Sequence, residues 1–469
     1  MSELWRLSAS EMARQFSAGE VTSRALVEAH LTRIDEVNPR VNAVVRVLRD
    51  NALEAASAAD LQREQGAALG PLHGVPFSVK ESIDVAGLPT TWGHLALSNA
   101  ISPGDAPVVE RMRAAGAIPI ARTNLPDFAF RPSTKSTLHG LTLNPWDRDR
   151  TAGGSSGGDA AALASGMTPI GLGTDLGGSL RNPANACGVV SVRPSAGRVP
   201  CAQIVPDASQ HITTQLMNVH GPIARTVADV RLVLQAIMGA HPMDPWSIDA
   251  PLIGKPLQSP IRVAVLTSLP GVALEDAVAD AVRGAADALS NAGYDVVEAC
   301  PPRYEEAVET WGRLMMGDQR YGIDGLIPLL GPEELQYFKL YTDAYPAFVD
   351  SFEMSAAFQR RHSIATDWSV FQDQHPLILG PTWTRVTPEH GYDIAGGDMA
   401  SLLSIIKAVT PANLLGLPSV CVPSRLNPAT GLPIGVLLGG RRFREDMCLD
   451  AAAIIEASSN VATPIDPRF

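Results

Sequence analysis

The sequence predicts an α/β fold, in which one large mixed β-sheet is covered by helices on both faces and a helical arm forms the N-terminus. Two patterns indicate this fold. From about residue 74 onward, short apolar strand segments alternate with helical segments, as in a sheet layered between helices. Near the C-terminus, two apolar strands flank a tight turn, and such a hairpin predicts antiparallel pairing within the same sheet.

The first 66 residues lack this alternation and read as a helical arm. Ser8 and Glu11 have the spacing of a capping box, which predicts the start of a helix. A second helix is predicted from Thr22 to Asn38, because a proline follows it, and a strand at 43–48 precedes an Ala-rich helix. We expect this arm to cover a sheet edge or a dimer contact, so a homodimer is one expected assembly.

Residues 67–300 form the predicted catalytic core, and residues 396–469 complete it. Asp105 is expected to cap the first helix of this core. Strands are expected at 75–79, 118–121, 168–173, 261–266, 295–298, 419–422 and 433–438. Helices are expected at 105–116, 157–165, 227–238, 275–292 and 445–457.

Residues 301–395 differ from the rest of the chain, because long polar helical segments interrupt the rhythm of strands. Tyr304 and Trp383 bound a stretch that holds 13 of the 25 aromatic residues. One interpretation is ordinary packing between helices. The other is a variable helical cap whose aromatic side chains line a substrate funnel, since binding pockets combine apolar walls with a few polar groups.

Composition and charge exclude several classes of protein. The chain has 469 residues and a net charge of −12, and an acidic surface repels nucleic acids and anionic membranes. Its five cysteines are widely spaced, with no C-x-x-C pair, which predicts free thiols in a reducing, cytoplasmic compartment. No apolar stretch reaches the ~18 residues of a membrane span, and the N-terminus lacks the apolar core of a signal peptide.

Several short motifs match known sites only formally. Residues 153–157 fit G-x-S-x-G, but the charged segment before them is no central strand, which a nucleophile elbow requires. The glycines at 171–177 lack the spacing of a dinucleotide-binding loop, and Pro183 prevents the long helix that such a loop begins. Residues 404–407 fit S-x-x-K without its companion motifs. No histidine or cysteine spacing indicates a metal site.

Two Gly-rich turns carry the candidate chemistry. Gly177 and Gly178 precede Ser179, so backbone N–H groups can converge on one point, as in an oxyanion hole beside a nucleophilic serine. Ser155 lies in the second turn. A serine needs a base, and Lys80 ends an apolar strand, where burial would lower its pKa. The residues alone leave two simpler interpretations open, a packing role for the turns and a surface position for the lysine.

The combination of motifs resembles the amidase signature family. The resemblance covers most of residues 1–240 and 405–460 and is poor across 301–395. The motifs that carry it are HGVPFSVK at 73–80, NPWD at 144–147, GGSSGG at 153–158, GTDLGGSLRNPA at 173–184, CGVV at 187–190 and RVP at 198–200, with weaker matches at 413–418 and 431–436.

The resemblance implies a Ser–cis-Ser–Lys triad. By motif position, Ser179 would be the nucleophile that forms the acyl-enzyme, and Ser155, in a cis peptide, would bridge Ser179 and Lys80. Lys80 would be the base. The backbone N–H groups of Leu176, Gly177, Gly178 and Ser179 would bind the oxyanion. The residues implied as supports or substrate contacts are Ala129, Ser156, Asp175 and Arg181.

The resemblance also implies one amidase domain over residues 1–469, with three α/β/α layers around a large, mixed, mostly parallel sheet. It implies hydrolysis of a small-molecule carboxylic amide, a linear one, without metal or cofactor. Family substrates include aliphatic, aryl, fatty-acyl and peptide amides, and some members cleave esters or carbamates. Two alternatives are the amidase subunit of a tRNA-dependent amidotransferase and a non-catalytic binding protein on the same scaffold.

Overall fold

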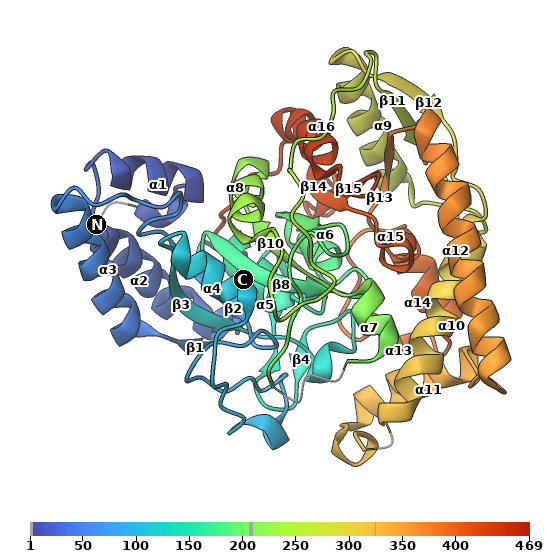
Figure 1. Cartoon of the computed structure of the whole chain (residues 1–469), viewed down its shortest axis with the longest axis horizontal. Helices are drawn as coiled ribbons and strands as arrows, with labels where there is room; N and C mark the ends of the chain where they lie inside the picture. The colour runs from blue at the N-terminus through green and yellow to red at the C-terminus, as the bar shows by residue number, and fades with distance from the viewer. Residues whose placement is uncertain (1–2, 206–209, 324) are drawn as a thin grey trace.

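The computed structural model describes residues 3–205, 210–323 and 325–469, without the side chains of residues 319 and 321–323. One 11-stranded sheet runs across the described part of the molecule, between the N-terminal helices and the helices that follow residue 304 (Figure 1). From edge to edge, its strands are β1 (Val44–Val47), β3 (Ile118–Thr123), β2 (Pro76–Lys80), β8 (Ile170–Asp175), β10 (Val219–Ala224), β9 (Val190–Arg193), β14 (Ser419–Leu426), β15 (Pro433–Gly440), β13 (Leu377–Pro381), β11 (Arg262–Val265) and β12 (Asp295–Glu298).

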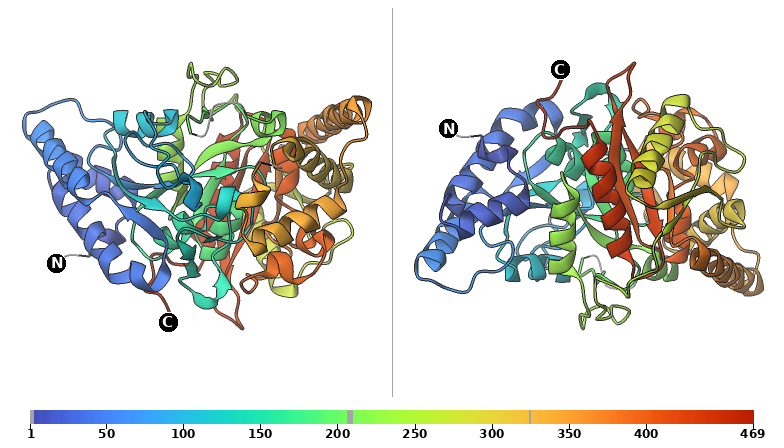
Figure 2. Two further views of the ribbon diagram at one scale, coloured as in Figure 1. Left: turned by 90° about the horizontal axis from the view of Figure 1, so that it is seen from below. Right: turned by 90° about the horizontal axis from the view of Figure 1, so that it is seen from above.

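Helices cover both faces of the sheet, which confirms the predicted three layers (Figure 2). The helices of one face are α1 (Ala9–Ser17), α4 (Pro107–Ala114), α8 (Val227–Ile237), α9 (Asp276–Asn291) and α16 (Glu445–Ser458). Those of the other face are α2 (Ser23–Val41), α3 (Arg49–Glu64), α5 (Gly157–Ala164) and α6 (Arg181–Cys187). Each layer buries its own apolar cluster against the sheet, so the strands in the middle are buried on both sides.

The sheet is mixed, as predicted, but it is not mostly parallel. Among the described strands of this large sheet, four pairings are parallel and six are antiparallel. The parallel pairs lie toward the flanks, where helices such as α4, α5 and α9 provide the long crossovers that parallel strands need. The central strands β10, β9, β14 and β15 are antiparallel to their neighbours, and the predicted C-terminal hairpin is β14–β15.

The N-terminal arm covers one edge of the sheet. Ser8 accepts a hydrogen bond from the backbone N–H of Glu11, which confirms the predicted start of α1. Helix α2 passes Asn38 and continues to Val41 with Pro39 inside it, so the predicted end is wrong. A proline this close to the C-terminus of a helix removes only one backbone hydrogen bond. Strand β1 forms the sheet edge, and a dimer contact through this arm stays a prediction.

The first helix of the core begins differently from the prediction. Asp105 does not cap α4, because the N-cap residue is Ala106 and Pro107 is the first helical residue. Proline suits this position, since its fixed φ matches a helix and it has no N–H group to satisfy. Asp105 instead accepts a hydrogen bond from the backbone N–H of Ala86 at 2.8 Å and fixes the loop after β2.

The predicted cap, residues 301–395, contains three long helices and one central strand. Strand β13 lies between β15 and β11, so this range also contributes to the core sheet. The other elements of this half are α7 (Ile212–Met217), α10 (Tyr304–Ile323), α11 (Pro332–Ala344), α12 (Ser351–Gln374), α13 (Tyr392–Ala395), α14 (Met399–Ile406) and α15 (Thr410–Leu415). Helix α10 packs against α12, α15 and α7, which brings it near the turn after β8.

Short elements complete the fold. They are the 3-10 helices η1 (Leu4–Arg6), η2 (Leu95–Leu97), η3 (Asp127–Ala129) and η4 (Ile327–Leu329), and the two-stranded ladders β4 (Lys135–Ser136) with β5 (Gly140–Leu141) and β6 (Leu143–Asn144) with β7 (Asp147–Thr151). No helix in the described ranges combines the length and the apolar content that crossing a bilayer would require.

Candidate active site

Strand β2 places Lys80 inside the protein. All five residues of the strand are buried, and Lys80 itself is 0% exposed. Successive side chains of a strand point to opposite faces. Phe77 and Val79 therefore pack into the cluster beneath α4 and α8, while Ser78 and Lys80 point toward α5. The structure thus excludes the surface position that the sequence alone left open for Lys80.

Three hydroxyl groups surround the amine of Lys80. Its Nζ lies 2.7 Å from Ser155 Oγ, 3.0 Å from Ser156 Oγ and 2.8 Å from Thr174 Oγ1. A neutral amine donates two hydrogen bonds and accepts one, so this arrangement lets one hydroxyl donate its proton to Nζ. Burial lowers the pKa of Lys80 well below its ordinary value of 10.5, although the nearby carboxylates of Asp159 and Asp175 act in the opposite direction.

A tight turn before α5 presents the two serines to Lys80. The peptide bond between Gly154 and Ser155 is cis, as the resemblance implied. A Cβ atom at Gly154 would lie 2.6 Å from the backbone of Ser133, so only glycine fits where these two segments meet. Ser156 occupies the N-cap position of α5, and the helix therefore holds both hydroxyl groups against the end of β2.

The second turn, between β8 and α6, carries Ser179. The backbone N–H of Ser156 donates to the carbonyl oxygen of Ser179 at 3.1 Å, so the two Gly-rich turns lie side by side. Gly178 has φ +95°, a conformation that favours glycine. Ser179 and Gly177 are partly exposed, whereas Lys80 and Ser155 are fully buried. A substrate can therefore approach Ser179 while the amine of Lys80 stays away from water.

The backbone N–H groups of this turn differ in their hydrogen bonding. Gly178 N–H donates to Asp175 Oδ1 at 2.8 Å, so it already has an acceptor. Within the described residues, no protein acceptor pairs with the N–H groups of Leu176, Gly177 or Ser179. Since these three residues are partly exposed, their N–H groups can donate to a bound ligand.

Asp175 and Arg181 hold the shape of the turn. Both are 0% exposed, and two nitrogen atoms of Arg181 each lie 2.9 Å from a carboxylate oxygen of Asp175. Asn413 also donates to Asp175, at 2.8 Å. Burial alone would raise the pKa of Asp175. The positive charge of Arg181 beside it lowers the pKa by more than burial raises it, so the carboxylate stays ionised. The carboxylate of Asp175 in turn anchors the backbone of Gly178 and Leu180.

The loop that includes Ala129 continues to Ser133, whose backbone lies against Gly154 in the turn that carries Ser155, and the loop is tied to α11 and α13. Phe128 and Ala129 have φ values of +52° and +60°, which is unusual for residues with a side chain. Two positions later, Arg131 is buried among carboxylates. Its guanidinium lies 2.7 Å from Asp393, 3.2 Å from Glu334 and 2.6 Å from Glu333. This cluster joins the loop to the aromatic-rich half of the molecule.

Aromatic side chains of the 301–395 region reach the Ser179 turn. The indole Nε1 of Trp311 donates to the carbonyl oxygen of Leu176 at 3.2 Å. A Cβ atom at Gly177 would lie 2.7 Å from the Trp311 ring, so the ring lies directly against the backbone there. Trp383 Nε1 donates to Asn182 Oδ1 at 2.8 Å, one helical turn beyond Ser179.

Three residues at the site were not singled out from the sequence. Thr174 accepts a hydrogen bond from Lys80. It was overlooked even though it directly precedes Asp175 in a recognised motif. Asp159 is fully buried beneath Ser156 at the end of the GGSSGG segment. His220 pairs with Thr174 across strands β10 and β8. Strand register brings His220 close, and no local pattern signals that. Among the described residues, no group of histidine, cysteine or acidic side chains is arranged to hold a metal ion.

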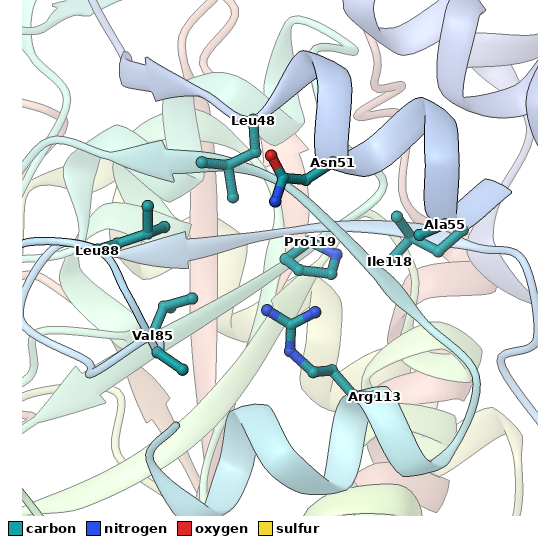
Figure 3. Close-up of a pocket in the computed structure, with 9 residues that line it drawn as sticks. Leu48, Asn51, Ala55, Val85, Leu88, Arg113, Ile118 and Pro119 are labelled. Carbon is teal, nitrogen blue, oxygen red and sulfur yellow. The ribbon is translucent and has the colours of Figure 1, made fainter. Parts of the chain in front are cut away.

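A surface pocket lies at the other end of β3 from this site. Figure 3 shows Leu48 and Asn51 above Pro119, with Arg113 rising toward it from α4. Pro119 is near the start of β3, whereas Thr123, at its end, pairs with Lys80. The pocket has a volume of about 90 Å³ and shares no residue with the cluster around Lys80.

Comparisons with known proteins agree with this geometry. The sequence model of the Amidase family matches residues 25–449. The chain is 40% identical over 460 residues to an indoleacetamide hydrolase of Bradyrhizobium diazoefficiens, covering 98% of this chain and 87% of that protein. It is 33% identical over 498 residues to one subunit of the glutamyl-tRNA(Gln) amidotransferase of Salinispora arenicola, covering 99% of both chains.

A solved structure shows the same fold. The crystal structure of a bacterial aryl acylamidase of the amidase signature family has a TM-score of 0.84 and 27% identity, with 97% of this chain and 96% of that chain covered. The match spans the arm, the sheet and the aromatic-rich half together. With the family model and the relatives, it shows that the chain belongs to the amidase signature family.

Proposed function

We propose that this chain hydrolyses a carboxylic amide through an acyl-enzyme on Ser179, with Ser155 as the relay and Lys80 as the base. The observation that carries the proposal is the fully buried amine of Lys80, 2.7 Å from the Ser155 hydroxyl. A base must lie within hydrogen-bond reach of the proton that it takes and must be unprotonated at working pH. Burial of Lys80 supports the second condition.

The proton moves in two short steps. Ser179 gives its hydroxyl proton to Ser155 as its oxygen attacks the carbonyl carbon, and Ser155 gives its own proton to Lys80. The ammonium of Lys80 then returns a proton through Ser155 to the departing nitrogen, and ammonia or an amine leaves. Water then attacks the acyl-enzyme and gives a proton through Ser155 to Lys80. Lys80 returns a proton through Ser155 to the oxygen of Ser179, and the acid leaves.

Backbone N–H groups would stabilise the oxyanion. Leu176, Gly177 and Ser179 offer N–H groups without a protein acceptor in the described residues. Gly178, the fourth predicted donor, is held by Asp175, and its role in this proposal is to fix the turn. Removal of one such donor costs about 10²–10³-fold in rate in enzymes of this kind.

The proposed substrate is a linear amide of an aromatic acetic acid, such as indoleacetamide. Two observations support this choice. The relative that is 40% identical to the chain carries the name indoleacetamide hydrolase, and Trp311 lies against the Ser179 turn. An aromatic ring beside the reacting carbonyl favours a flat, apolar acyl group. Ala129 would offer its backbone carbonyl to the amide nitrogen. The setting proposed is cytoplasmic, which the five free cysteines support.

The test is ammonia release from indoleacetamide and from acetamide by the purified chain. We expect kcat/KM to be higher for indoleacetamide, and we expect Ser179→Ala to remove both activities. A chain that releases ammonia from neither compound, and that a fluorophosphonate probe does not label, would instead be a non-catalytic binding protein.

A second candidate is the amidase subunit of a tRNA-dependent amidotransferase. The identity of 33% over 99% of both chains favours it. Such a subunit releases ammonia from glutamine for a partner. Glutamine hydrolysis that exceeds indoleacetamide hydrolysis, and that rises when the partner proteins and charged tRNA are added, would establish this second function in place of the first.

A further inference from the structure

Helix α5 repeats one contact pattern twice along β2 and β8. Ser156 lies against Lys80 on β2, and a Cβ atom at Gly173 on β8 would be 2.7 Å from the Ser156 hydroxyl. Three residues along the helix, Asp159 lies against Ser78, and a Cβ atom at Gly171 would be 2.9 Å from its carboxylate. Positions three apart share one helix face, and positions two apart share one strand face.

This pattern places a carboxyl group directly behind Lys80. Ser78 and Lys80 are separated by about 7 Å along the strand, since each residue adds about 3.3 Å. Ser78 Oγ donates to Asp159 Oδ1 at 3.3 Å. Asp159 is 0% exposed, and within the described residues its Oδ2 atom has no hydrogen-bond partner. A buried carboxylate without full hydrogen bonding is costly and needs a compensating positive charge.

The other acidic side chains near Lys80 are already paired, and the nearby histidine is neutral. Asp175, on β8, forms its ion pair with Arg181. Glu81, the next residue on the chain, accepts hydrogen bonds from Thr91 and His139. Burial and then the charge of Lys80 lower the pKa of His220 to about 4, so this histidine is neutral at pH 7.

Arg122, on β3, contributes a second positive charge near Asp159. It donates to the carbonyl oxygen of Ile83 at 2.8 Å and favours the ionised form of Asp159. Burial raises the pKa of Asp159 above its ordinary value, and the positive charges of Lys80 and Arg122 act in the opposite direction. The charges of Lys80 and Arg122 therefore favour the carboxylate form of Asp159, and that carboxylate in turn favours the ammonium form of Lys80.

We propose that Asp159 is a positioning residue for proton transfer: its ionised carboxylate stabilises the ammonium that forms when Ser155 gives its proton to Lys80. This inference rests on the proposed function. Atoms and charges balance, because the proton that leaves Ser155 binds Lys80 and the carboxylate of Asp159 keeps its charge. The pair is neutral after the step, so no isolated positive charge is created in the core.

The test measures Lys80 directly. The chain has only five lysines, Lys80, Lys135, Lys255, Lys339 and Lys407, so ¹³Cε-lysine labelling gives few NMR signals, and Lys80→Met identifies the one from Lys80. In Asp159→Asn, which keeps the shape and removes the charge, we expect the pKa of Lys80 to fall by about one unit, since an opposite charge nearby favours the ammonium. The acid limb of the kcat/KM profile should move down by the same amount.

Two further variants separate this proposal from a structural role. Ser78→Ala removes a neutral partner of Asp159 and leaves the carboxylate, so its Lys80 signal should titrate as in the wild type. Asp159→Ser serves if the Asn variant does not fold. An unchanged pKa of Lys80 in the folded Asp159 variants would overturn the proposal. Because the NMR titration needs no substrate, it decides this question even if indoleacetamide is not hydrolysed, which would count against the proposed function alone.

Discussion

The cluster around Lys80 and the aromatic side chains around Trp311 meet at the Ser179 turn but are built differently. Lys80 is surrounded by three hydroxyl groups within 3.0 Å, and the residues that supply them belong to short Gly-rich segments. Trp311 packs among other aromatic side chains, such as Tyr341, whose ring centre lies 6.3 Å away. It donates one hydrogen bond to the Ser179 turn.

This difference separates the chemistry of the site from its selectivity. The residues around Lys80 contact only the groups that would transfer the proton, so substitutions there should affect the hydrolysis of every amide. The aromatic residues touch the backbone of Leu176 and Gly177 from outside, so changes there should affect some substrates more than others. Substitutions in the two regions test this division, and the largest effect is expected at the nucleophile.

Ser179→Ala should lower kcat/KM by about 10⁶-fold for every amide, because it removes the atom that forms the acyl-enzyme. Thermal unfolding should be unchanged, since Ser179 is partly exposed and its backbone contacts remain. The measurement is steady-state kinetics on a small and a bulky amide together with calorimetry. A folded variant with activity near that of the wild type would show that another residue is the nucleophile.

Lys80→Met should lower kcat/KM by about 10³-fold, in the middle of the range for loss of a general base. In the wild-type enzyme, kcat/KM should rise with pH and level off below pH 10.5, because burial lowers the pKa of Lys80 and only the neutral amine accepts a proton. The measurement is the pH profile of kcat/KM. A rate that falls as pH rises through neutrality would contradict a lysine base.

The sequence predicted the elements of the sheet better than their directions. Strands such as 295–298 were predicted correctly, because apolar runs between turns are a local signal. Their pairing depends on contacts between distant segments, so of the six antiparallel pairs in the large sheet only the C-terminal hairpin β14–β15 was foreseen. Strand β13 was missed for a related reason: its short apolar run follows 73 residues of mostly helical pattern, and pairing with β15 and β11 makes it part of the core.

Local signals also explain which site residues were found. Lys80, Ser155 and Ser179 lie in recognisable motifs, and the structure brings Lys80 and Ser155 into contact. Asp393 gave no such signal, although it binds Arg131 from 262 positions away. Ion pairs across this distance depend on the final packing of α13, which no spacing in the sequence specifies.

Arg131→Gln tests how firmly the two halves are joined. The change leaves the buried carboxylates of Asp393 and Glu334 without their cation, which costs about 3–5 kcal/mol of unfolding free energy. The loss should be smaller at lower pH, because protonation removes the unpaired negative charge and the folded variant binds protons more readily than the unfolded chain. Urea unfolding at two pH values measures both effects.

Arg303→Gln is the matched control for this prediction. Arg303 also binds two carboxylates, those of Glu306 and Asp367, but its side chain is 30% exposed. Exposed ion pairs contribute about 0–1 kcal/mol, so this variant should unfold close to the wild-type urea concentration. Equal destabilisation by the two substitutions would mean that burial of the Arg131 cluster does not govern its strength.

The smallest expected effect concerns the wall of the acyl pocket. We predict that aromatic residues of 301–390, with the Phe128–Arg131 loop, form this wall. Replacing one ring by alanine should change the ratio of kcat/KM between a bulky and a small amide by about 10–200-fold, which corresponds to about 1–3 kcal/mol for an apolar group in a pocket. The rings to replace are those of Trp311, Tyr337, Tyr341 and Trp383. Tyr321, a fifth aromatic residue of interest, has a side chain outside the described part of the chain.

Trp368→Ala separates pocket effects from loss of stability. Trp368 is as buried as Trp311, but its ring packs on Tyr304 and its Nε1 donates to Pro302 rather than to the Ser179 turn. Losing this ring should reduce the amount of folded enzyme for all substrates equally and leave the kcat/KM ratio unchanged. A shift in the ratio for Trp311→Ala but not for Trp368→Ala would place specificity at the turn. Unchanged ratios in every variant would mean that these aromatic residues are ordinary core and that selectivity originates elsewhere.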